Sequence, residues 1–163
     1  MDKSVAPLVS VVMNCYNGEK YLREAIDSIY AQTYKNWEII FWDNASTDAS
    51  ASIAKSYDKR IKYFLAPITT PLGEARNHAL KKTNGEYIVF LDCDDLYLIV
   101  RLEQQINLMQ SKDYVMSYGS NAVIDENGKE IKKNIVKNKS GNVFSSLLRR
   151  YEINMQTVML KKD

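Results

Sequence analysis

Four apolar runs, separated by segments with helical spacing, restrict the fold of this chain more than any other feature. They occupy residues 8–14, 37–42, 61–65 and 87–91, and the first has the β-branched apolar composition of a central strand covered on both faces. Helical segments follow the first three runs after polar turns or loops. This alternation predicts right-handed crossovers and therefore an α/β fold, with a mostly parallel sheet and helices on both of its faces.

The segments between these runs carry signals that begin and end helices. The first segment has apolar residues at helical spacing, namely Leu22, Ala25, Ile26, Ile29 and Tyr30. Ser46 or Asp48 can cap a short second helix. A third helix is predicted from residue 73 to about residue 83, where Asn84-Gly85 ends it.

The last third of the chain is predicted to add a longer helix, further strands and a hairpin. Apolar residues mark the helix at positions 99, 102, 106 and 109. The turn sequence of residues 125–128, Asp-Glu-Asn-Gly, indicates a small β-hairpin between 122–124 and 130–132. The remaining predicted elements are a strand, a short helix and a last strand, at 114–118, 143–151 and 157–160.

Polar groups follow three of the predicted strands where each strand ends. They lie at 14–17, at 43–44 and at 92–95, the last with three aspartates in four residues. Ligands of open α/β sheets bind outside the carboxyl ends of the strands, so we expect these groups to converge. Crowded carboxylates repel one another unless a cation, a positive side chain or water offsets the charge, and a divalent metal is the first candidate. A helix cap would explain only one of the three aspartates.

Composition and charge favour one domain over residues 1–163. The chain has 163 residues, of which 45% are hydrophobic, enough for one core, and its net charge of +2 is too small to indicate nucleic-acid binding. The lysines toward the C-terminus predict a solvated face, with peripheral association at the anionic inner face of a membrane as the weaker alternative. No segment has the roughly 20 apolar residues of a membrane span or the layout of a signal peptide, which favours a cytoplasmic protein. Cys15 and Cys93 are expected to be free buried thiols.

The turn after the first strand lacks the glycines of a phosphate-binding loop. Gly18 is its single glycine, whereas a dinucleotide-binding turn needs several, and no Gly-Lys-Ser/Thr loop occurs. A bound nucleoside diphosphate would therefore need Asp92, Asp94 and a hard cation. Mg²⁺ or Mn²⁺ suits this arrangement, because each takes one or two carboxylates and completes its shell with phosphate oxygens and water.

Four motifs occur in a fixed order along the chain: VSVVMNCYN at 9–17, WDNASTD at 42–48, ARN at 75–77 and GEYIVFLDCDD at 85–95. In this order and spacing they resemble the family 2 glycosyltransferases of the GT-A fold, and the resemblance covers residues 7 to about 110. It implies a Rossmann-like sheet that binds a nucleotide-sugar donor. It also implies metal-dependent, usually inverting transfer, with Mg²⁺ or Mn²⁺ bridging the diphosphate. The acceptor would be a hydroxyl of a glycan or a lipid-linked molecule.

The resemblance implies roles for side chains at the ends of the first two strands. Asn14 and Tyr16 would line the base and ribose pocket, with Tyr16 stacking or packing on the base. Asp43 and Asn44 occupy the place where the family commonly has two adjacent aspartates that read the uracil or the ribose. Asn44 keeps an acceptor and adds a donor, which leaves the identity of the base open.

The same resemblance implies roles around the acidic cluster. Asp94 would be the direct metal ligand, and Asp92 would join it while contacting the ribose or the sugar. Asp95 would orient the metal shell or a water on the acceptor side. Arg76 would face the diphosphate or, equally well, form an ion pair with Asp43 or Asp92.

The catalytic base is the role that no residue fills convincingly. In the family it is an acidic residue well beyond the metal motif, and the candidates here lie in or beside a hairpin or after a helix: Asp125, Glu126, Glu130 and Glu152. We therefore expect the base beyond Asp163, in a truncated domain with a nucleotide-sugar-binding half at 7–110 and the start of an acceptor-side half at 111–163. Two alternatives stay open. One is a nucleotide-sugar-binding module that is inactive in isolation, and the other is a haloacid-dehalogenase-type phosphatase, whose Asp-x-Asp motif ends the first strand.

Overall fold

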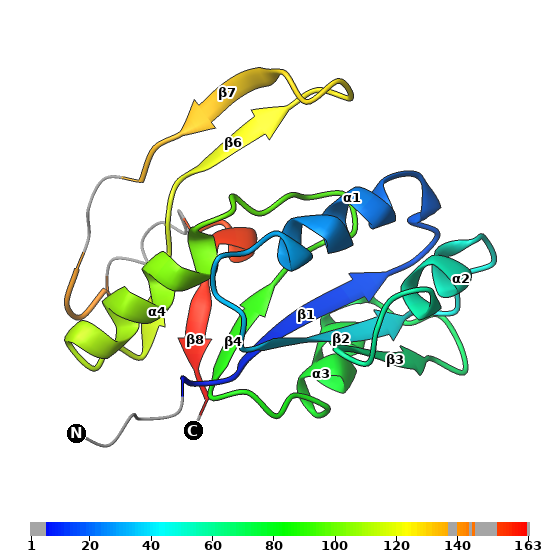
Figure 1. The fold of residues 1–163 in the computed structure, drawn as a ribbon, viewed down its shortest axis with the longest axis horizontal. Coiled ribbons are helices and arrows are strands. Elements are labelled where there is room, and N and C mark those ends of the chain that lie inside the picture. The colour runs from blue at the N-terminus through cyan, green and yellow to red at the C-terminus, as the bar shows by residue number, and fades with distance from the viewer. Residues whose placement is uncertain (1–5, 137–139, 144, 146–152, 163) are drawn as a thin grey trace.

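The structure is a computed structural model that describes residues 6–136, 140–143, 145 and 153–162. Its strands are β1 (Val9–Cys15), β2 (Trp37–Asp43), β3 (Ile61–Leu65), β4 (Tyr87–Phe90), β5 (Met116–Ser117), β6 (Asn121–Ile124), β7 (Glu130–Asn134) and β8 (Met159–Lys161). Its helices are α1 (Glu19–Tyr30), α2 (Ser50–Lys55), α3 (Leu72–Leu80), α4 (Arg101–Ser111) and the 3₁₀ turn η1 (Met155–Thr157). Within the described residues the chain forms a six-stranded sheet of order β3-β2-β1-β4-β8-β5 and a separate β6-β7 ribbon (Figure 1).

The strand directions decide where the polar groups lie. β3, β2, β1 and β4 run parallel to one another, with Cys15 opposite Asp43 at the carboxyl ends of β1 and β2. β8 runs antiparallel to β4, with Met159 opposite Val89. Its first residues therefore lie at the same edge of the sheet as the last residues of β4, and the segment before β8 comes close to the acidic cluster.

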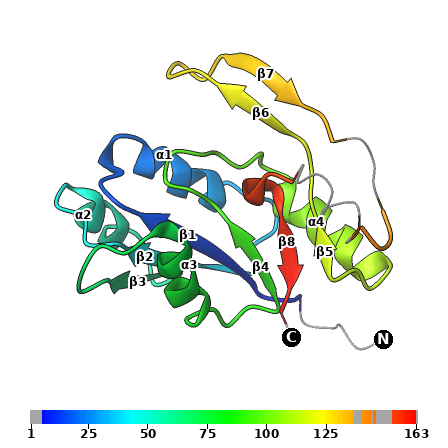
Figure 2. The same ribbon diagram turned by 180° about the vertical axis from the view of Figure 1, so that it is seen from behind.

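Two apolar layers cover the sheet, one on each face. α1, α2 and α4 pack on one face through residues such as Leu22, Ala54 and Ile106, whereas α3 packs on the other through Ala75 and Ala79. Figure 2 shows α3 on the face that is turned away in Figure 1. β1, β2 and β4 are buried at every position, which agrees with their mostly apolar sequences. Fully burying a leucine or isoleucine contributes roughly 1.5–3 kcal/mol, so these layers stabilise the domain.

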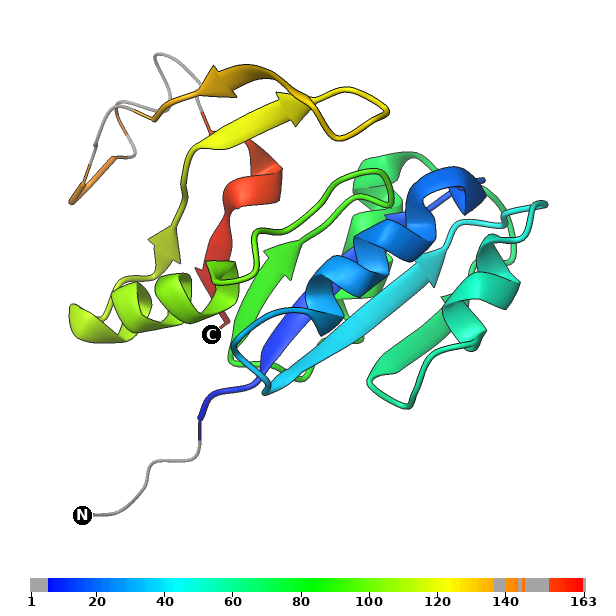
Figure 3. The same ribbon diagram turned by 45° about the horizontal axis from the view of Figure 1, so that its top comes forward.

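The hairpin stands away from the main sheet, as Figure 3 shows for β6 and β7. Its turn is closed by the Asp125 carboxylate, which accepts the backbone N–H groups of Asn127 at 2.9 Å and Lys129 at 3.0 Å. Glu126 in this turn pairs with Lys20 of α1 at 4.0 Å. This exposed ion pair joins the tip of the ribbon to α1.

The predicted fold is confirmed, with differences at several element boundaries. The strand predicted at 114–118 is reduced to two residues, and the last strand begins at Met159 because the 3₁₀ turn η1 occupies the residues before it. Ile99 is 56% exposed and precedes α4. Its carbonyl instead accepts the N–H of Thr33 at 2.9 Å, which ties the loop to the end of α1. The helix predicted at 143–151 lies largely outside the described residues.

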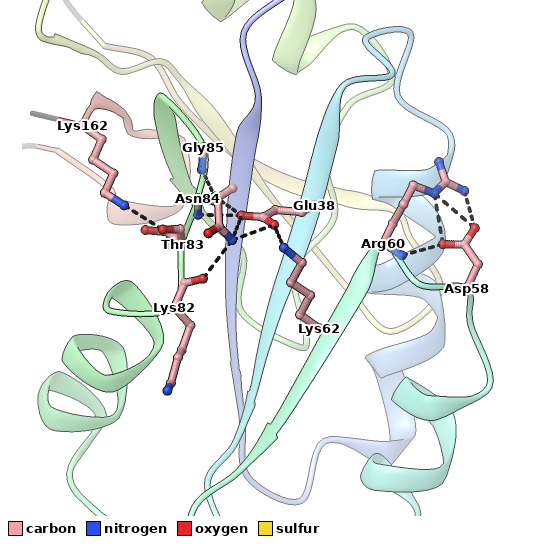
Figure 4. A network of polar contacts seen from close by, with 10 residues as sticks. Glu38, Asp58, Arg60, Lys62, Lys82, Thr83, Asn84, Gly85 and Lys162 are labelled. Atoms are coloured by element: carbon pink, nitrogen blue, oxygen red, sulfur yellow. Dashed lines mark hydrogen bonds and ion pairs between the residues drawn. The ribbon is translucent and has the colours of Figure 1, made fainter.

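A network around Glu38 ties the amino ends of the parallel strands together (Figure 4). The buried carboxylate of Glu38 accepts hydrogen bonds from Ser10 Oγ at 2.7 Å and the Asn84 N–H at 2.8 Å, and it pairs with Lys62 Nζ at 2.5 Å. Gly85 lies so close to β1 that a Cβ there would be 2.6 Å from the backbone nitrogen of Ser10. Glu38 thus links β1, β2, β3 and the start of β4 at the edge opposite the acidic cluster.

Among the helices that the structure describes, none has both the length and the apolar character that a membrane span requires.

Candidate functional site

The loops after β1 and β2 are hydrogen-bonded to each other at the carboxyl edge of the sheet. Asn17 Oδ1 accepts the backbone N–H of Thr47 at 2.8 Å, and Asn17 has a φ of 52°, a left-handed conformation that asparagine tolerates. Asp48 accepts the N–H of Glu19 at 2.9 Å, while Glu19 accepts the N–H of Ala49 at 2.8 Å. These reciprocal bonds hold the N-termini of α1 and α2 beside the loops.

A pocket of about 200 Å³ opens between the ends of β1 and β2 and the start of α3. Its lining residues are Asn14, Cys15, Tyr16, Asn44, Thr69, Thr70, Leu72 and Ala75. Three residues that the sequence suggested for substrate binding, Asn14, Tyr16 and Asn44, therefore meet in one cavity. They meet because the carboxyl ends of parallel strands lie at one edge of the sheet, as the predicted parallel sheet implied.

Tyr16 and Asn14 differ in how they present their side chains to this pocket. Tyr16 is 54% exposed, so its ring offers an apolar face to a planar ligand. Asn14 is 92% buried, since only 8% of its surface is exposed, and in the described part of the chain nothing accepts a hydrogen bond from its Nδ2. Leaving a buried donor unpaired costs about 1–3 kcal/mol. A ligand or a water that accepts a hydrogen bond from Asn14 Nδ2 would remove this cost.

Asp43 and Asn44 are adjacent in sequence but serve different parts of the structure. Asp43 is fully buried, and its carboxylate accepts the Ser46 N–H at 2.7 Å and the Tyr63 hydroxyl at 2.6 Å. Burial and the contact with Asp43 raise the pKa of Tyr63 well above its ordinary value. Asp43 does not line the pocket, whereas Asn44 does.

The side chain of Asn44 forms a pair of hydrogen bonds with the backbone of Thr70. Asn44 Nδ2 donates to the Thr70 carbonyl at 2.8 Å, and Asn44 Oδ1 accepts the Thr70 N–H at 3.2 Å. The amide therefore holds the loop between Pro67 and Pro71 against the end of β2. An aspartate, which has no N–H groups, could make only the second of these bonds.

Asp92 is bound from two sides. Arg76 of α3 pairs with it, with Arg76 Nη2 donating to Asp92 Oδ1 at 3.0 Å, so one of the two ion pairs considered from the sequence is formed and the other, to Asp43, is not present. On the other side Gln156 Nε2 donates to Asp92 Oδ2, and Gln156 Oε1 accepts the backbone N–H of Asp92 at 3.1 Å. Neither Arg76 nor Asp92 is among the residues that line the pocket. The acidic loop meets the pocket instead through Cys93, which packs at Gly18 together with the lining residue Cys15.

Asp94 and Asp95 complete the acidic group. Asp94 is exposed, whereas Asp95 is partly buried. Burial, reinforced by the negative charges of Asp94 and Asp92, raises the pKa of Asp95, while Arg101 opposes this change. Within the described residues no set of three or more histidine, cysteine, aspartate and glutamate side chains is arranged to enclose a metal ion. One or two carboxylates with open positions nonetheless fit Mg²⁺ or Mn²⁺ held jointly with phosphate oxygens.

Gly18 packs where the β1 loop meets the acidic loop. A Cβ at Gly18 would lie 2.7 Å from Cys93 Sγ and 2.8 Å from Cys15 Sγ, which is closer than atoms can approach. The single glycine of this turn thus allows two loops to pack. Both cysteines are free, as expected, but Cys93 is only partly buried.

The sequence did not point to Thr70 or Gln156. Two prolines marked the Thr70 loop without indicating that its backbone would meet Asn44. Gln156 lies 64 positions from Asp92, and no local pattern distinguishes it from other surface glutamines. The antiparallel placement of β8, which brings it there, is a tertiary feature.

Comparisons with known proteins identify the family of the chain. The sequence model of a family described as "Glycosyl transferase family 2" matches residues 10–161. An uncharacterized glycosyltransferase of Haemophilus influenzae is 37% identical over 160 residues, which make up 96% of this chain and 63% of that protein. WfgD of Escherichia coli, a "UDP-Glc:alpha-D-GlcNAc-diphosphoundecaprenol beta-1,3-glucosyltransferase", is 36% identical over 121 residues, 74% of this chain and 48% of that protein. The chain thus spans less than two thirds of the length of these relatives.

Solved structures share the fold. TarS of S. aureus, in complex with UDP-GlcNAc, superposes with a TM-score of 0.64 at 27% identity, over 66% of this chain and 32% of that one. The mannosyltransferase PcManGT of Pyrobaculum calidifontis, in complex with GDP-Man and Mn²⁺, has a TM-score of 0.65 at 20% identity, over 97% of this chain and 45% of that one. With the family match over nearly its whole length, these likenesses show that the chain has the GT-A fold and belongs to glycosyl transferase family 2.

Proposed function

We propose that the protein transfers a sugar from a nucleotide-sugar donor to an acceptor hydroxyl, with the aid of Mg²⁺ or Mn²⁺. The observation that carries this proposal is the pocket at the carboxyl edge, whose lining residue Cys15 packs at Gly18 together with Cys93 of the acidic loop. A nucleoside diphosphate needs an apolar surface for its base and a positive counter-charge for its phosphates. The pocket and the adjacent acidic group, once loaded with a cation, supply both.

In this proposal the pocket binds the nucleoside. Tyr16 packs on the base, and the unpaired Asn14 amide donates to an oxygen of the base or ribose. Asn44 contributes mainly by holding the Thr69–Thr70 wall of the pocket. Asp43 supports the loop from below through Ser46 and Tyr63, a less direct role than the motif implied.

The diphosphate and the cation lie at the end of β4. Asp94 would be the direct ligand, because it is exposed, and Asp92 would contribute while held by Arg76. When bound, the cation would neutralise the charge that develops on the nucleoside diphosphate as it leaves. The Arg76 side chain is 21% exposed, and its guanidinium would add positive charge near the diphosphate.

Transfer would proceed by in-line displacement with inversion at the sugar carbon. A carboxylate base removes the proton of the acceptor hydroxyl as that oxygen attacks. We place the donor in residues 7–110 and the acceptor side in residues 111–163. The acceptor class suggested by the name of WfgD, a lipid-linked glycan, would bring the protein to the inner face of a membrane as a peripheral partner.

The donor is tested first by a thermal-shift screen of UDP-, GDP-, dTDP- and CDP-sugars with Mn²⁺. UDP-sugars head this panel because TarS was solved with UDP-GlcNAc. We expect one nucleotide class to raise the melting temperature in a Mn²⁺-dependent way. If no nucleotide sugar stabilises the protein with or without Mn²⁺, the proposed donor site is wrong.

The metal role is tested by calorimetry on Asp94→Asn. Removing the ligand charge should abolish the Mn²⁺-dependent part of nucleoside diphosphate binding, because an amide is a much weaker ligand for a hard cation. Glu24→Gln, which neutralises an exposed carboxylate of α1, is the matched control and should bind as the wild type does. Unchanged Mn²⁺-dependent binding in Asp94→Asn would remove Asp94 from the metal site. Donor binding without sugar transfer by this 163-residue chain would favour the alternative, a nucleotide-sugar-binding module.

A further inference from the structure

Gln156 makes two hydrogen bonds to the same residue of the acidic group. Its Oε1 accepts the backbone N–H of Asp92 at 3.1 Å, and its Nε2 donates to Asp92 Oδ2. The opposite carboxylate oxygen, Oδ1, accepts Arg76 Nη2 at 3.0 Å. The Asp92 carboxylate is therefore held between α3 on one side and η1 on the other.

The chemistry of these bonds fixes the orientation of the Gln156 amide. A backbone N–H can only donate, so the amide oxygen must face the Asp92 backbone. The NH₂ group then has to face the carboxylate, which accepts it. In a flipped amide the Gln156 NH₂ would face the Asp92 N–H, and the Gln156 oxygen would face the Asp92 carboxylate. Only the observed orientation therefore makes both hydrogen bonds.

The segment that carries Gln156 is itself held in place. Asn154 Oδ1 accepts the N–H of Gln156 at 2.9 Å, which caps η1. From α4, Gln105 Nε2 donates to the Thr157 carbonyl at 2.9 Å, and Arg101 Nη2 donates to the carbonyl of Val158 at 3.4 Å. Pairing of β8 with β4 then fixes the residues that follow. Gln156 thus reaches Asp92 from a backbone that is bonded on three sides.

We propose that Gln156 is a positioning residue that sets the orientation of Asp92 for metal-dependent donor binding. This inference rests on the proposed function, because it concerns the carboxylates assigned there. With Asp92 Oδ1 on Arg76 and Oδ2 on Gln156, the carboxylate cannot rotate freely, so its orientation toward a bound cation is fixed. A residue in the segment assigned to the acceptor side therefore controls the geometry of the donor side.

Gln156→Met tests this role, because methionine has nearly the same length and offers no amide. Nucleoside diphosphate binding is measured by calorimetry with Mn²⁺ and with EDTA, using whichever of UDP, GDP, dTDP and CDP the wild type binds best. Losing a hydrogen-bond partner of a metal-ligating carboxylate typically costs 10–100-fold in metal affinity. The increase in nucleoside diphosphate affinity that Mn²⁺ causes, called here the Mn²⁺-dependent gain, should therefore fall about tenfold or more. Binding in EDTA should stay unchanged, because Gln156 does not line the pocket. Gln104→Met, on the exposed side of α4, is the control and should retain the full gain.

Gln156→Glu separates the two hydrogen bonds and serves if the methionine variant fails to fold. Glutamate keeps the acceptor for the Asp92 N–H but cannot donate to its carboxylate, so the Mn²⁺-dependent gain should again fall. A folded Gln156→Met or Gln156→Glu protein that binds with the wild-type gain overturns the positioning role. Parallel losses with Mn²⁺ and with EDTA also overturn it, because they indicate a general structural effect. A wild type that binds none of the four diphosphates contradicts the proposed function itself.

Discussion

Replacing Glu38 by glutamine should destabilise the domain without touching the donor site. The side chain of Glu38 is 5% exposed. Its carboxylate accepts hydrogen bonds from Ser10 Oγ and the Asn84 N–H, and it pairs with Lys62. Glutamine has the same shape and one acceptor oxygen, but its NH₂ group would face donors. The change therefore removes charge-assisted hydrogen bonds and leaves at least one donor unpaired (Figure 4).

The size of the effect follows from the separate contacts. Hydrogen bonds to a charged group contribute about 1.5–3 kcal/mol and neutral ones about 0.5–1.5 kcal/mol. The bonds from Ser10 Oγ and the Asn84 N–H should therefore lose roughly 1 kcal/mol each. The Lys62 side chain is 43% exposed, so water screens its ion pair, and this contact adds less than about 1 kcal/mol. We expect Glu38→Gln to lower the free energy of unfolding by about 2–3 kcal/mol.

Urea unfolding followed by circular dichroism measures this difference, with Lys62→Met as the comparison. Lys62→Met should cost less than Glu38→Gln, because it removes the screened pair and keeps the buried hydrogen bonds. A loss below about 0.5 kcal/mol for Glu38→Gln, or a larger loss for Lys62→Met, would refute the assignment of the stability to the buried bonds.

The same network predicts a pH dependence. Burial alone would raise the pKa of Glu38, but the bonds from Lys62, Ser10 and Asn84 together outweigh it and hold the pKa below its ordinary value. A depressed pKa means that the unfolded chain takes up the proton first as the pH falls. The stabilisation by Glu38 is therefore complete above the unfolded value of roughly 4.3 and is lost as the pH falls toward the folded value. The difference in the free energy of unfolding between the wild type and Glu38→Gln should therefore become smaller as the pH falls through this range.

Two further substitutions test the packing of the site. Gly18→Ala should destabilise the protein by about 1–3 kcal/mol, because its Cβ would overlap Cys93 Sγ and Cys15 Sγ, and Cys93→Ala should restore part of that loss in a double mutant measured by urea unfolding. Purely additive losses would contradict this close packing. Asn44→Asp should lower the free energy of unfolding by about 1–3 kcal/mol, because a carboxylate oxygen would face the Thr70 carbonyl where Nδ2 now donates. An aspartate variant as stable as the wild type would show that this pair does not hold the loop.

The sequence predicted the sheet because the information was local. Strands buried on both faces need mostly apolar sequences, and β1, β2 and β4 have them. Parallel order then placed Asn14, Tyr16 and Asn44 at one edge, and the pocket contains all three. The placement of the polar groups therefore followed from the fold class.

Hydrogen-bond partners could not be predicted in the same way, because they depend on how distant loops pack. The resemblance assigned Asn44 to the base or ribose, but it did not indicate that the Asn44 amide would bond the backbone of Thr70. Ile99 fitted the helical spacing of α4, yet the chain before Arg101 turns toward Thr33 instead. Spacing shows which residues share a helix face, but it does not show at which residue the helix begins when a tertiary contact holds the preceding chain.

The clearest case is the residue that reaches Asp92 from the far end of the described chain. In a purely parallel sheet, the residues before a strand lie at the amino edge, away from the ligand. β8 enters the sheet in the opposite direction, so the residues before it lie at the carboxyl edge, and Gln156 meets Asp92 there. One reversed strand thus allows a segment outside the four motifs to act on a motif carboxylate. A search for site residues in sheets of this kind should therefore include the residues that precede an antiparallel strand as well as those that follow the parallel ones.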